Sequence, residues 1–281
     1  MRTVDVGQIT DAIERMSRDS NTRLPDDVVA ALRAAREREV SQTAREVLDQ
    51  LLLNAERAEQ TGLPLCQDTG IAVVFIDLGR DVHLNGGDLQ TAVDAGVRRG
   101  YRKGFLRKSV VWDPLDRASN TGDNTPAVLH VRIIEGDEVT VHFAPKGGGS
   151  ENMSALWMLT PAQGRAGIIE AISAQIDAAG GMPCPPLVLG VGLGGTFEMA
   201  ALLAKRALLR PLGTPSPTDD IADLERDALD AVNATGVGPM GLGGSTTALA
   251  VQIERHPCHI ASLPLALNVQ CHAARHQTTV I

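Results

Sequence analysis

Residues 63–78 read Leu-Pro-Leu-Cys-Gln-Asp-Thr-Gly-Ile-Ala-Val-Val-Phe-Ile-Asp-Leu, a turn-rich segment followed by an almost unbroken apolar run. The run from Ile71 to Leu78 is rich in β-branched residues, which is typical of a buried strand. Cys66 lies in the loop just before it. Because strands and helices alternate irregularly in the rest of the chain, the predicted fold class is mixed α/β (α+β).

Helical patterns occupy the N-terminal fifth of the chain. One helix is predicted to open at Pro25, and a second to begin with a capping box at Thr43–Glu46 and to stop near Gly62. A strand-and-helix region with cysteine-bearing loops follows. We expect helices at 89–102, 154–177, 197–209 and 221–234, strands at 186–191 and 262–270, and a β-hairpin within 128–143. No linker separates two parts, so one domain over 1–281 is predicted.

The composition excludes several classes of function. The chain has 281 residues and is 43% hydrophobic, which is enough for a sizeable core, but only 2% are aromatic. Few aromatic residues argue against stacking on nucleic-acid bases. The formal net charge of −8 also opposes binding to a phosphate backbone. We therefore expect no nucleic-acid partner.

The sequence also argues against a membrane location. The N-terminus has no apolar signal core, and no stretch approaches the roughly 18 uncharged apolar residues that a membrane span needs. Even the most apolar helix candidate, at 197–209, carries charged residues. A cytoplasmic location is expected, where the four cysteines would remain reduced.

Three cysteines share a similar setting far apart in the chain: Cys66, Cys184 in Met-Pro-Cys-Pro-Pro, and Cys271 in Asn-Val-Gln-Cys-His. Each lies in a short break between apolar runs, where a side chain can point into a shared pocket. Three thiolates are one short of the four that close an iron–sulfur cluster, which leaves one iron open to act as a Lewis acid. The alternative is three buried structural thiols, since no C-x-x-C is present.

Glycine-rich segments allow two further interpretations. Residues 190–195 match G-x-G-x-x-G between a strand and a helix, as in dinucleotide-binding oxidoreductases, but no acidic residue ends a second strand about 20 positions later. Gly-Gly followed by Ser or Thr occurs three times, at 148–150, 194–196 and 243–245. Such segments can bind anions at helix N-termini or can simply make tight turns.

Four segments carry a family resemblance: Cys66–Gly70, Lys146–Asn152, Gly192–Thr196 and His256–His276. They closely resemble class I fumarate hydratases, which are oxygen-sensitive iron–sulfur hydro-lyases, and the resemblance covers nearly the whole chain. It matches the α subunit, or the N-terminal domain of single-chain members. The resemblance implies a 4Fe-4S cluster on Cys66, Cys184 and Cys271, with Cys258 not a ligand, and reversible hydration of fumarate to L-malate.

The resemblance also suggests roles for individual residues. It implies that Gln67 and Asp68 contact the substrate, that Arg107 binds a carboxylate and that His259 lies at the substrate; Gly149 is expected in the same pocket. Asp68 is two residues beyond Cys66 and is well placed to act as general base. The alternatives are a surface charge for Arg107 and a core histidine for His259.

Single-chain members of the family continue into a second domain that supplies further substrate-binding and catalytic residues. We therefore expect a separate β subunit to complete the active site on a dicarboxylate substrate, within a higher oligomer. Three alternatives remain: the α subunit of the homologous L-tartrate dehydratase or of a mesaconate hydratase, an NAD-binding oxidoreductase, and a module whose cluster only carries electrons.

Overall fold

The apolar run after Cys66 forms β2 (Ile71–Gly79), an interior strand of a four-stranded sheet in the order β10-β5-β2-β4. The computed structural model describes residues 2–281. The chain divides into two compact units: the first contains the residues up to Pro25, Ala55–Gly148 and Arg275–Ile281, and the second contains Asp26–Asn54 and Gly149–Ala274. Strands and helices mix in both, which confirms the mixed α/β class. A single functional domain over 1–281 stays a prediction.

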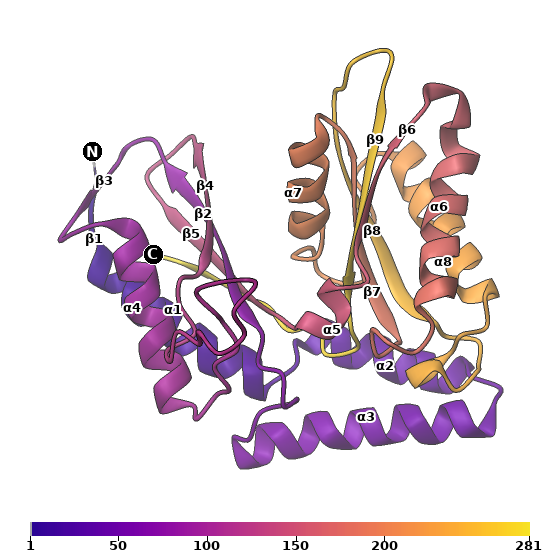
Figure 1. Cartoon of the computed structure of the whole chain (residues 1–281), viewed down its shortest axis with the longest axis horizontal. Coiled ribbons are helices and arrows are strands. Elements are labelled where there is room, and N and C mark those ends of the chain that lie inside the picture. The colour runs from indigo at the N-terminus through magenta and orange to yellow at the C-terminus, as the bar shows by residue number, and fades with distance from the viewer. Residues whose placement is uncertain (1) are drawn as a thin grey trace. The chain divides into compact units, whose positions relative to one another are not determined.

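In the first unit two neighbouring helices, α1 and α4, pack against the sheet (Figure 1). Apolar side chains of both helices form one buried cluster with those of β2 and β5. Gly96 lets the helices approach closely, since a Cβ there would lie 2.7 Å from the Cβ of Ile13. The elements are β1 (Arg2–Asp5), α1 (Val6–Thr22), the end of α3 (Gln42–Thr61), β2, β3 (Val82–Asn85), α4 (Leu89–Lys103), β4 (Val128–Ile134), β5 (Val139–Lys146) and β10 (Gln277–Val280).

The hairpin predicted within 128–143 is wrong, although both of its strands exist. β4 pairs with β2 in parallel and β5 pairs with β2 antiparallel, so β2 lies between them. The reason is burial: β2 is apolar throughout and gains a partner on each edge, whereas the side chains of β4 are largely exposed. The connection around Gly136 instead bonds to the end of β2, where the amide of Gly79 donates to the carbonyl of Glu138.

The second unit is a four-stranded sheet, in the order β6-β9-β7-β8, with α7 on one face and α6 and α8 on the other (Figure 1). The larger apolar cluster joins the sheet to α6 and α8. The elements are α2 (Asp26–Arg38), the start of α3, α5 (Gly148–Glu151), β6 (Ala155–Leu159), α6 (Gly164–Ala179), β7 (Leu187–Gly194), α7 (Phe197–Ala207), α8 (Asp219–Ala234), β8 (Ala248–His256) and β9 (Leu263–Gln270).

The helix predicted at 154–177 is wrong in its first part. Residues 155–159 form β6, which pairs with β9, and a short 3₁₀ turn at Pro161–Gln163 precedes α6. Proline stops the strand and suits the first turn of a helix, so the element type changes at that point. The helix at 43–61 is confirmed, but the hydroxyl of Ser41, not a capping box at Thr43, accepts from the amide of Ala44 at 3.4 Å.

Gly190 and Gly192 explain the glycine pattern on β7. A Cβ at Gly192 would lie 1.9 Å from the carbonyl oxygen of Ala200, and one at Gly190 would lie 2.2 Å from that of Ala204. These glycines therefore let α7 pack with its backbone directly on the strand. Close packing of a helix accounts for them without a nucleotide, which argues against the oxidoreductase interpretation.

We expect Gly192→Ala to lower the free energy of unfolding by about 3 kcal/mol, because the new methyl group meets rigid backbone and forces α7 away from the sheet. Urea denaturation followed by circular dichroism measures the change. Gly149→Ala is the control, because its new methyl group would meet nothing closer than 3.9 Å. Equal stability of the two variants would contradict this packing.

Candidate active site

The loop that carries Cys66 folds back on its own sulfur. The amide of Asp68 donates to Cys66 Sγ at 3.4 Å, and the thiol lies 3.3 Å from Gln67 Oε1. The carboxylate of Asp68 accepts from the amide of Gly70 at 3.0 Å. Cys66 is half-buried and forms no disulfide. A sulfur that accepts an N–H group is suited to carry negative charge, as a cluster ligand must.

Three buried side chains hold the backbone carbonyls of this loop. The hydroxyl of Tyr101 lies 2.7 Å from the carbonyl oxygen of Thr69 and 2.9 Å from that of Gly70. Asn124 Nδ2 donates to the Gly70 carbonyl at 3.1 Å, and Arg275 Nη2 donates to the Asp68 carbonyl. Sequence reasoning missed all three. For Tyr101 and Asn124 the available signals were the chain's single tyrosine and the Asn-Thr-Gly-Asp-Asn-Thr-Pro segment.

Tyr101 can only act as a neutral donor here. Burial raises the pKa of its hydroxyl well above the ordinary value, and the nearby charge of Arg275 opposes that rise only in part. The proton therefore stays on Tyr101 throughout the physiological range, which keeps the hydrogen bond to the Cys66 loop.

We expect Tyr101→Phe to lower the free energy of unfolding by about 1–3 kcal/mol, because the buried carbonyl of Thr69 loses its donor. Chemical denaturation measures the loss. Phe105→Leu, at a side chain that is 93% exposed, serves as the control for changing an aromatic residue. A stability loss confined to the control would show that the Tyr101 hydroxyl does not secure the loop.

The glycine segment after β5 is fastened to the same loop. The amide of Gly148 donates to the second carboxylate oxygen of Asp68 at 2.7 Å. Gly70 has a φ of +74°, and a Cβ there would lie 2.7 Å from the amide nitrogen of Lys146. Only glycine combines this conformation with this approach. Asp68 thus connects the Cys66 loop to the Lys146–Gly148 segment through both of its oxygens.

Cys184 and Cys271 lie together at one end of the second unit's sheet. The amide of His272 donates to the carbonyl of Cys184 at 3.2 Å, and the neighbouring strands pair Val188 with Gln270. Neither cysteine forms a disulfide, and both are half-buried. Cys184 has a φ of +57°, a conformation that non-glycine residues rarely adopt and that is common at functional sites. Within either unit of residues 2–281, no three His, Cys, Asp or Glu side chains form a metal site. Because Cys66 belongs to the first unit, convergence of all three thiols stays a prediction.

Cys258 and His259 lie at the opposite end of that sheet, in the connection between β8 and β9. β9 runs from Leu263 to Gln270, so about 25 Å of strand separates them from Cys184 and Cys271. Cys258 is exposed and donates to the carbonyl of Ser262 at 3.4 Å. The separation agrees with leaving Cys258 out of the ligand set.

The expected grouping of His259 with the cysteines is therefore not found within its own unit. The ring is exposed, and its Nδ1 accepts from the amide of Ala261 at 3.1 Å, so Nε2 carries the proton in the neutral ring. The tail segment that carries the family resemblance contains both His259 and Cys271. β9 lies between them, so the two residues are at opposite ends of that strand. A substrate role for His259 stays a prediction.

Arg107 and Gln67 are exposed. The carbonyl of Arg107 accepts from the hydroxyl of Thr69 at 2.9 Å, so the arginine lies beside the Cys66 loop. Within residues 2–281 its guanidinium forms no ion pair and is free to receive an anion. Gly149 follows at the start of α5, where its nearest non-local neighbour is the carbonyl of Met182, close to Cys184 in sequence.

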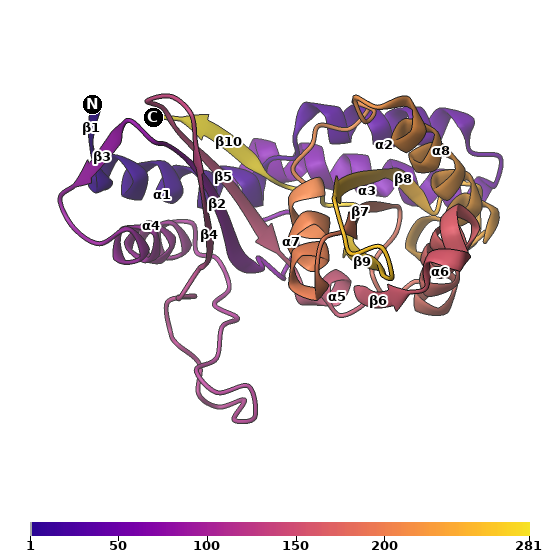
Figure 2. The same cartoon turned by 90° about the horizontal axis from the view of Figure 1, so that it is seen from above.

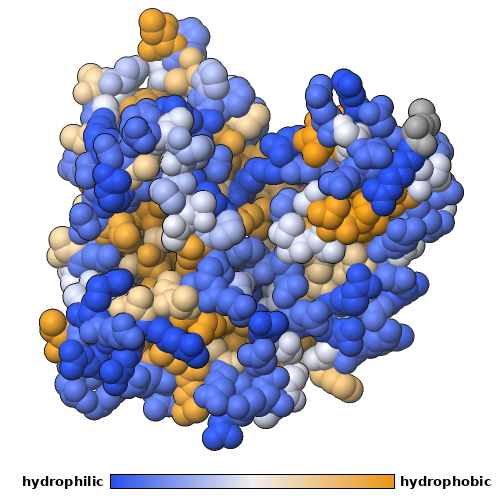
Figure 3. Space-filling view, turned by 180° about the vertical axis from the view of Figure 1, so that it is seen from behind, coloured by the Kyte–Doolittle hydropathy of each residue, from blue (hydrophilic) through white to orange (hydrophobic). Residues whose placement is uncertain are grey.

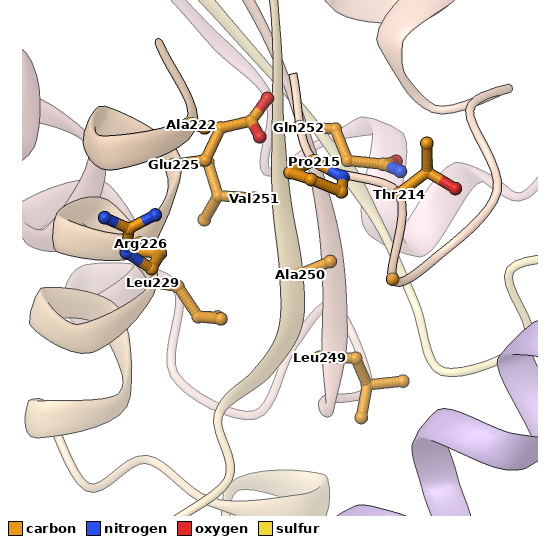
Figure 4. A pocket seen from close by; sticks show the side chains of 11 residues that line it. Thr214, Pro215, Ala222, Glu225, Arg226, Leu229, Leu249, Ala250, Val251 and Gln252 are labelled. Carbon is orange, nitrogen blue, oxygen red and sulfur yellow. The ribbon is translucent and has the colours of Figure 1, made fainter. Parts of the chain in front are cut away.

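One pocket of the second unit lies away from the predicted site residues. It has a volume of about 400 Å³ and is lined by α8, β8 and the loop at 213–215. Figure 4 shows Val251 and Gln252 on opposite sides of β8, with Leu229 on the same side as Val251 and Thr214 on the same side as Gln252. It contains none of the predicted site residues, so its size does not make it the active site.

A second pocket, of about 280 Å³, includes part of the glycine-rich motif. Glu151 pairs with Lys205 of α7, and its other oxygen accepts from Asn268 Nδ2 at 3.0 Å. Ser154 also bonds Asn268 at 3.1 Å. These contacts fasten the end of the Lys146–Asn152 motif to α7 and β9, which gives Glu151 a structural role.

Comparison with known proteins identifies the family of this chain. The family model described as "Fumarate hydratase (Fumerase)" matches residues 10–280. A Methanocaldococcus jannaschii protein is 41% identical over 276 residues, covering 95% of each chain, and is provisionally named subunit alpha of L(+)-tartrate dehydratase. The L(+)-tartrate dehydratase subunit alpha of Escherichia coli K12 is 30% identical over 278 residues, which is 98% of this chain and 91% of that protein. Within residues 2–281 no helix is both long and apolar enough to cross a membrane. The chain therefore belongs to the fumarate hydratase family and is an α-subunit-type chain of a hydro-lyase.

Proposed function

We propose that this chain is the α subunit of a cytoplasmic iron–sulfur hydro-lyase that reversibly hydrates fumarate to L-malate. The observation that carries the proposal is that Cys184 and Cys271 lie at one end of a sheet, together with a third cysteine outside any disulfide, Cys66, on a loop fixed by buried side chains. Three half-buried cysteines that form no disulfide, one of which accepts an N–H bond, fit a 4Fe-4S cluster with one open iron. When bound, such a cluster supplies a Lewis acid for the substrate oxygens.

The remaining steps fall to the chain's own residues. Arg107 is proposed to bind one substrate carboxylate, a task that suits a planar guanidinium without an ion-pair partner. Asp68 is proposed to take the C3 proton when malate loses water, and to return it on hydration. Both of its oxygens already accept backbone N–H groups, which orients the carboxylate while leaving further lone pairs free.

A separate β subunit is proposed to complete the site. Relatives of this chain are named as alpha subunits, which implies such a partner. The segment between α4 and β4 is an extended excursion of the first unit (Figure 2). It exposes Phe105, Trp112 and Leu115, of which Leu115 is 92% exposed. On the face that Figure 3 shows, apolar residues are interspersed with hydrophilic ones. We propose that these three side chains contact the partner, because Arg107 lies in the same segment.

A second candidate reaction is the dehydration of L-tartrate, favoured by the names of the relatives. L-Malate and L-tartrate, the two molecules that lose water, share two carboxylates and differ by one hydroxyl group, so the same carboxylate-binding and proton-transfer groups would serve both. The Lys146–Asn152 and Asn120–Pro126 segments favour the fumarate reaction in our interpretation.

The test is anaerobic reconstitution of the chain with iron and sulfide, with and without its β partner, followed by parallel assays of fumarate, mesaconate and L-tartrate. We expect fumarate to be hydrated fastest, and only with the partner present, because the chain alone supplies half of the site. Faster turnover of L-tartrate would transfer the assignment to the second candidate. Turnover by the cluster-loaded chain alone would refute the need for a partner.

A further inference from the structure

Arg275 is a buried cation without an ion-pair partner. Its side chain belongs to a residue that is 3% exposed, and its Nη2 donates to the backbone carbonyl of Asp68. Its Nε and Nη1 are buried without a hydrogen-bond partner. Among residues 2–281 no carboxylate lies within ion-pair distance of it. Because an unpaired buried charge is costly, a further anion close to Arg275 would stabilise it; the Asp68 carboxylate, which acts on the same Tyr101 hydroxyl, is the nearby negative charge that the chain supplies.

One residue connects this guanidinium to the sulfur of Cys66. Asp68 donates through its amide to Cys66 Sγ at 3.4 Å and accepts from Arg275 through its carbonyl. The backbone of one residue and two hydrogen bonds place Cys66 Sγ and the Arg275 guanidinium within roughly 10 Å of each other. Lys146, which is also 3% exposed, lies at the end of β5 beside Gly70. Two buried cationic side chains, Arg275 and Lys146, therefore lie beside the loop that carries Cys66 and the carboxylate of Asp68.

The charge of Arg275 affects the pKa of Tyr101. It opposes the rise that burial causes in the pKa of Tyr101, whose hydroxyl bonds the next two carbonyls of the same loop. A charge inside the protein is screened far less than one at the surface, so it acts over the distance to Cys66.

We propose that Arg275 is a positioning residue whose positive charge stabilises the anionic sulfur ligands at Cys66. The inference rests on the proposed function, since the further anion is the cluster with its thiolates. The hydrogen bond of Arg275 goes to the Asp68 carbonyl and not to the sulfur, so Arg275 acts on Cys66 by its charge. The exposed Arg107, by contrast, remains the residue for substrate.

The proposal predicts a shift in the cluster's reduction potential. Reduction adds one negative charge, which a nearby cation stabilises, so removal of the cation should lower the potential. One charge acting over roughly 10 Å at an effective dielectric constant of about 20 changes the ratio of reduced to oxidised cluster on the order of tenfold at a fixed potential.

Three substitutions separate the charge from the hydrogen bond. Arg275→Lys keeps both the charge and a donor, Arg275→Gln keeps a donor only, and Arg275→Met removes both. The control is Arg57→Met, which removes the same charge from an exposed position on α3. Each full-length chain is reconstituted anaerobically with iron and sulfide and titrated with dithionite, and the reduced cluster is followed by electron paramagnetic resonance. Chemical denaturation of the same chains without iron reports stability.

If charge is the role, Arg275→Gln and Arg275→Met share a lowered potential, while Arg275→Lys and Arg57→Met match the parent chain. A purely structural role gives another order: stability follows the hydrogen-bond donor, and the potential does not change. That order overturns the inference, as does an equal shift in Arg275→Lys and Arg275→Gln. Where Arg275→Met does not fold, the comparison of Lys with Gln decides. A parent chain that forms no cluster refutes the proposed cofactor itself, and the inference with it.

Discussion

Replacement of Cys66, Cys184 or Cys271 by serine is expected to abolish cluster assembly, and with it all hydratase activity. A thiolate binds iron in such clusters and a serine hydroxyl is a poor substitute, so no one of the three ligands is dispensable. The visible absorption and iron content after anaerobic reconstitution measure the loss. Because Cys184 and Cys271 are joined by the His272 amide, changes at either should behave alike.

Cys258→Ser is the matched control, since Cys258 is exposed at the far end of the same sheet. It should reconstitute with the iron content of the parent chain. A cluster that survives serine at any one of the three positions, or that is lost on changing Cys258, would show that the ligand set has been assigned wrongly.

Asp68→Asn is expected to lower kcat by about 10²–10⁴-fold, the usual contribution of a general acid or base. The asparagine also presents an NH₂ group to one of two backbone N–H donors, Gly70 or Gly148, and so loses one contact that orients the side chain. Steady-state kinetics of the reconstituted complex gives kcat, and the cluster's absorption shows that it is intact. Loss of the cluster would make Asp68 a structural group, and an unchanged kcat would remove it from the mechanism.

Arg107→Ala provides the contrast, because a carboxylate is present in both substrate and transition state. Removing its partner should mainly raise KM and leave kcat close to that of the parent. The two variants together separate proton transfer from substrate binding. Equal effects on kcat would contradict that division.

Local patterns predicted most elements correctly where the hydrophobic periodicity and the residues that end an element, such as glycine and proline, indicated the same boundaries. The apolar run at 71–78, the glycine after α3 and the helices at 89–102 and 221–234 needed only near neighbours in sequence. The predictions of the hairpin and of the start of the helix at 154–177 were wrong because both depend on strands that are distant in sequence. β2 lies between β4 and β5, and residues 155–159 pair with β9 as a strand. β8 was missed altogether.

In the candidate site, likewise, some residues could be predicted from the sequence and others could not. Cysteines and carboxylates have recognisable chemistry, so Cys66, Asp68, Cys184 and Cys271 could be singled out in the sequence. The residues that support them could not, since Tyr101, Asn124 and Arg275 act through backbone carbonyls 31 to 207 positions away. His259 was singled out by the family resemblance, and its substrate role stays a prediction, because β9 separates it from Cys271 within its own unit.

The first unit takes its last strand, β10, from the end of the chain, after the whole second unit has been made. While a ribosome is still translating residues before Arg275, β5 has an unpaired edge and the carbonyl of Asp68 lacks its cationic partner. We expect the Cys66 loop, which Tyr101 and Asn124 can hold earlier, to gain its last supporting hydrogen bond only when synthesis has passed this point. The order of synthesis would then keep the three thiols from receiving iron before the polypeptide that must surround it exists.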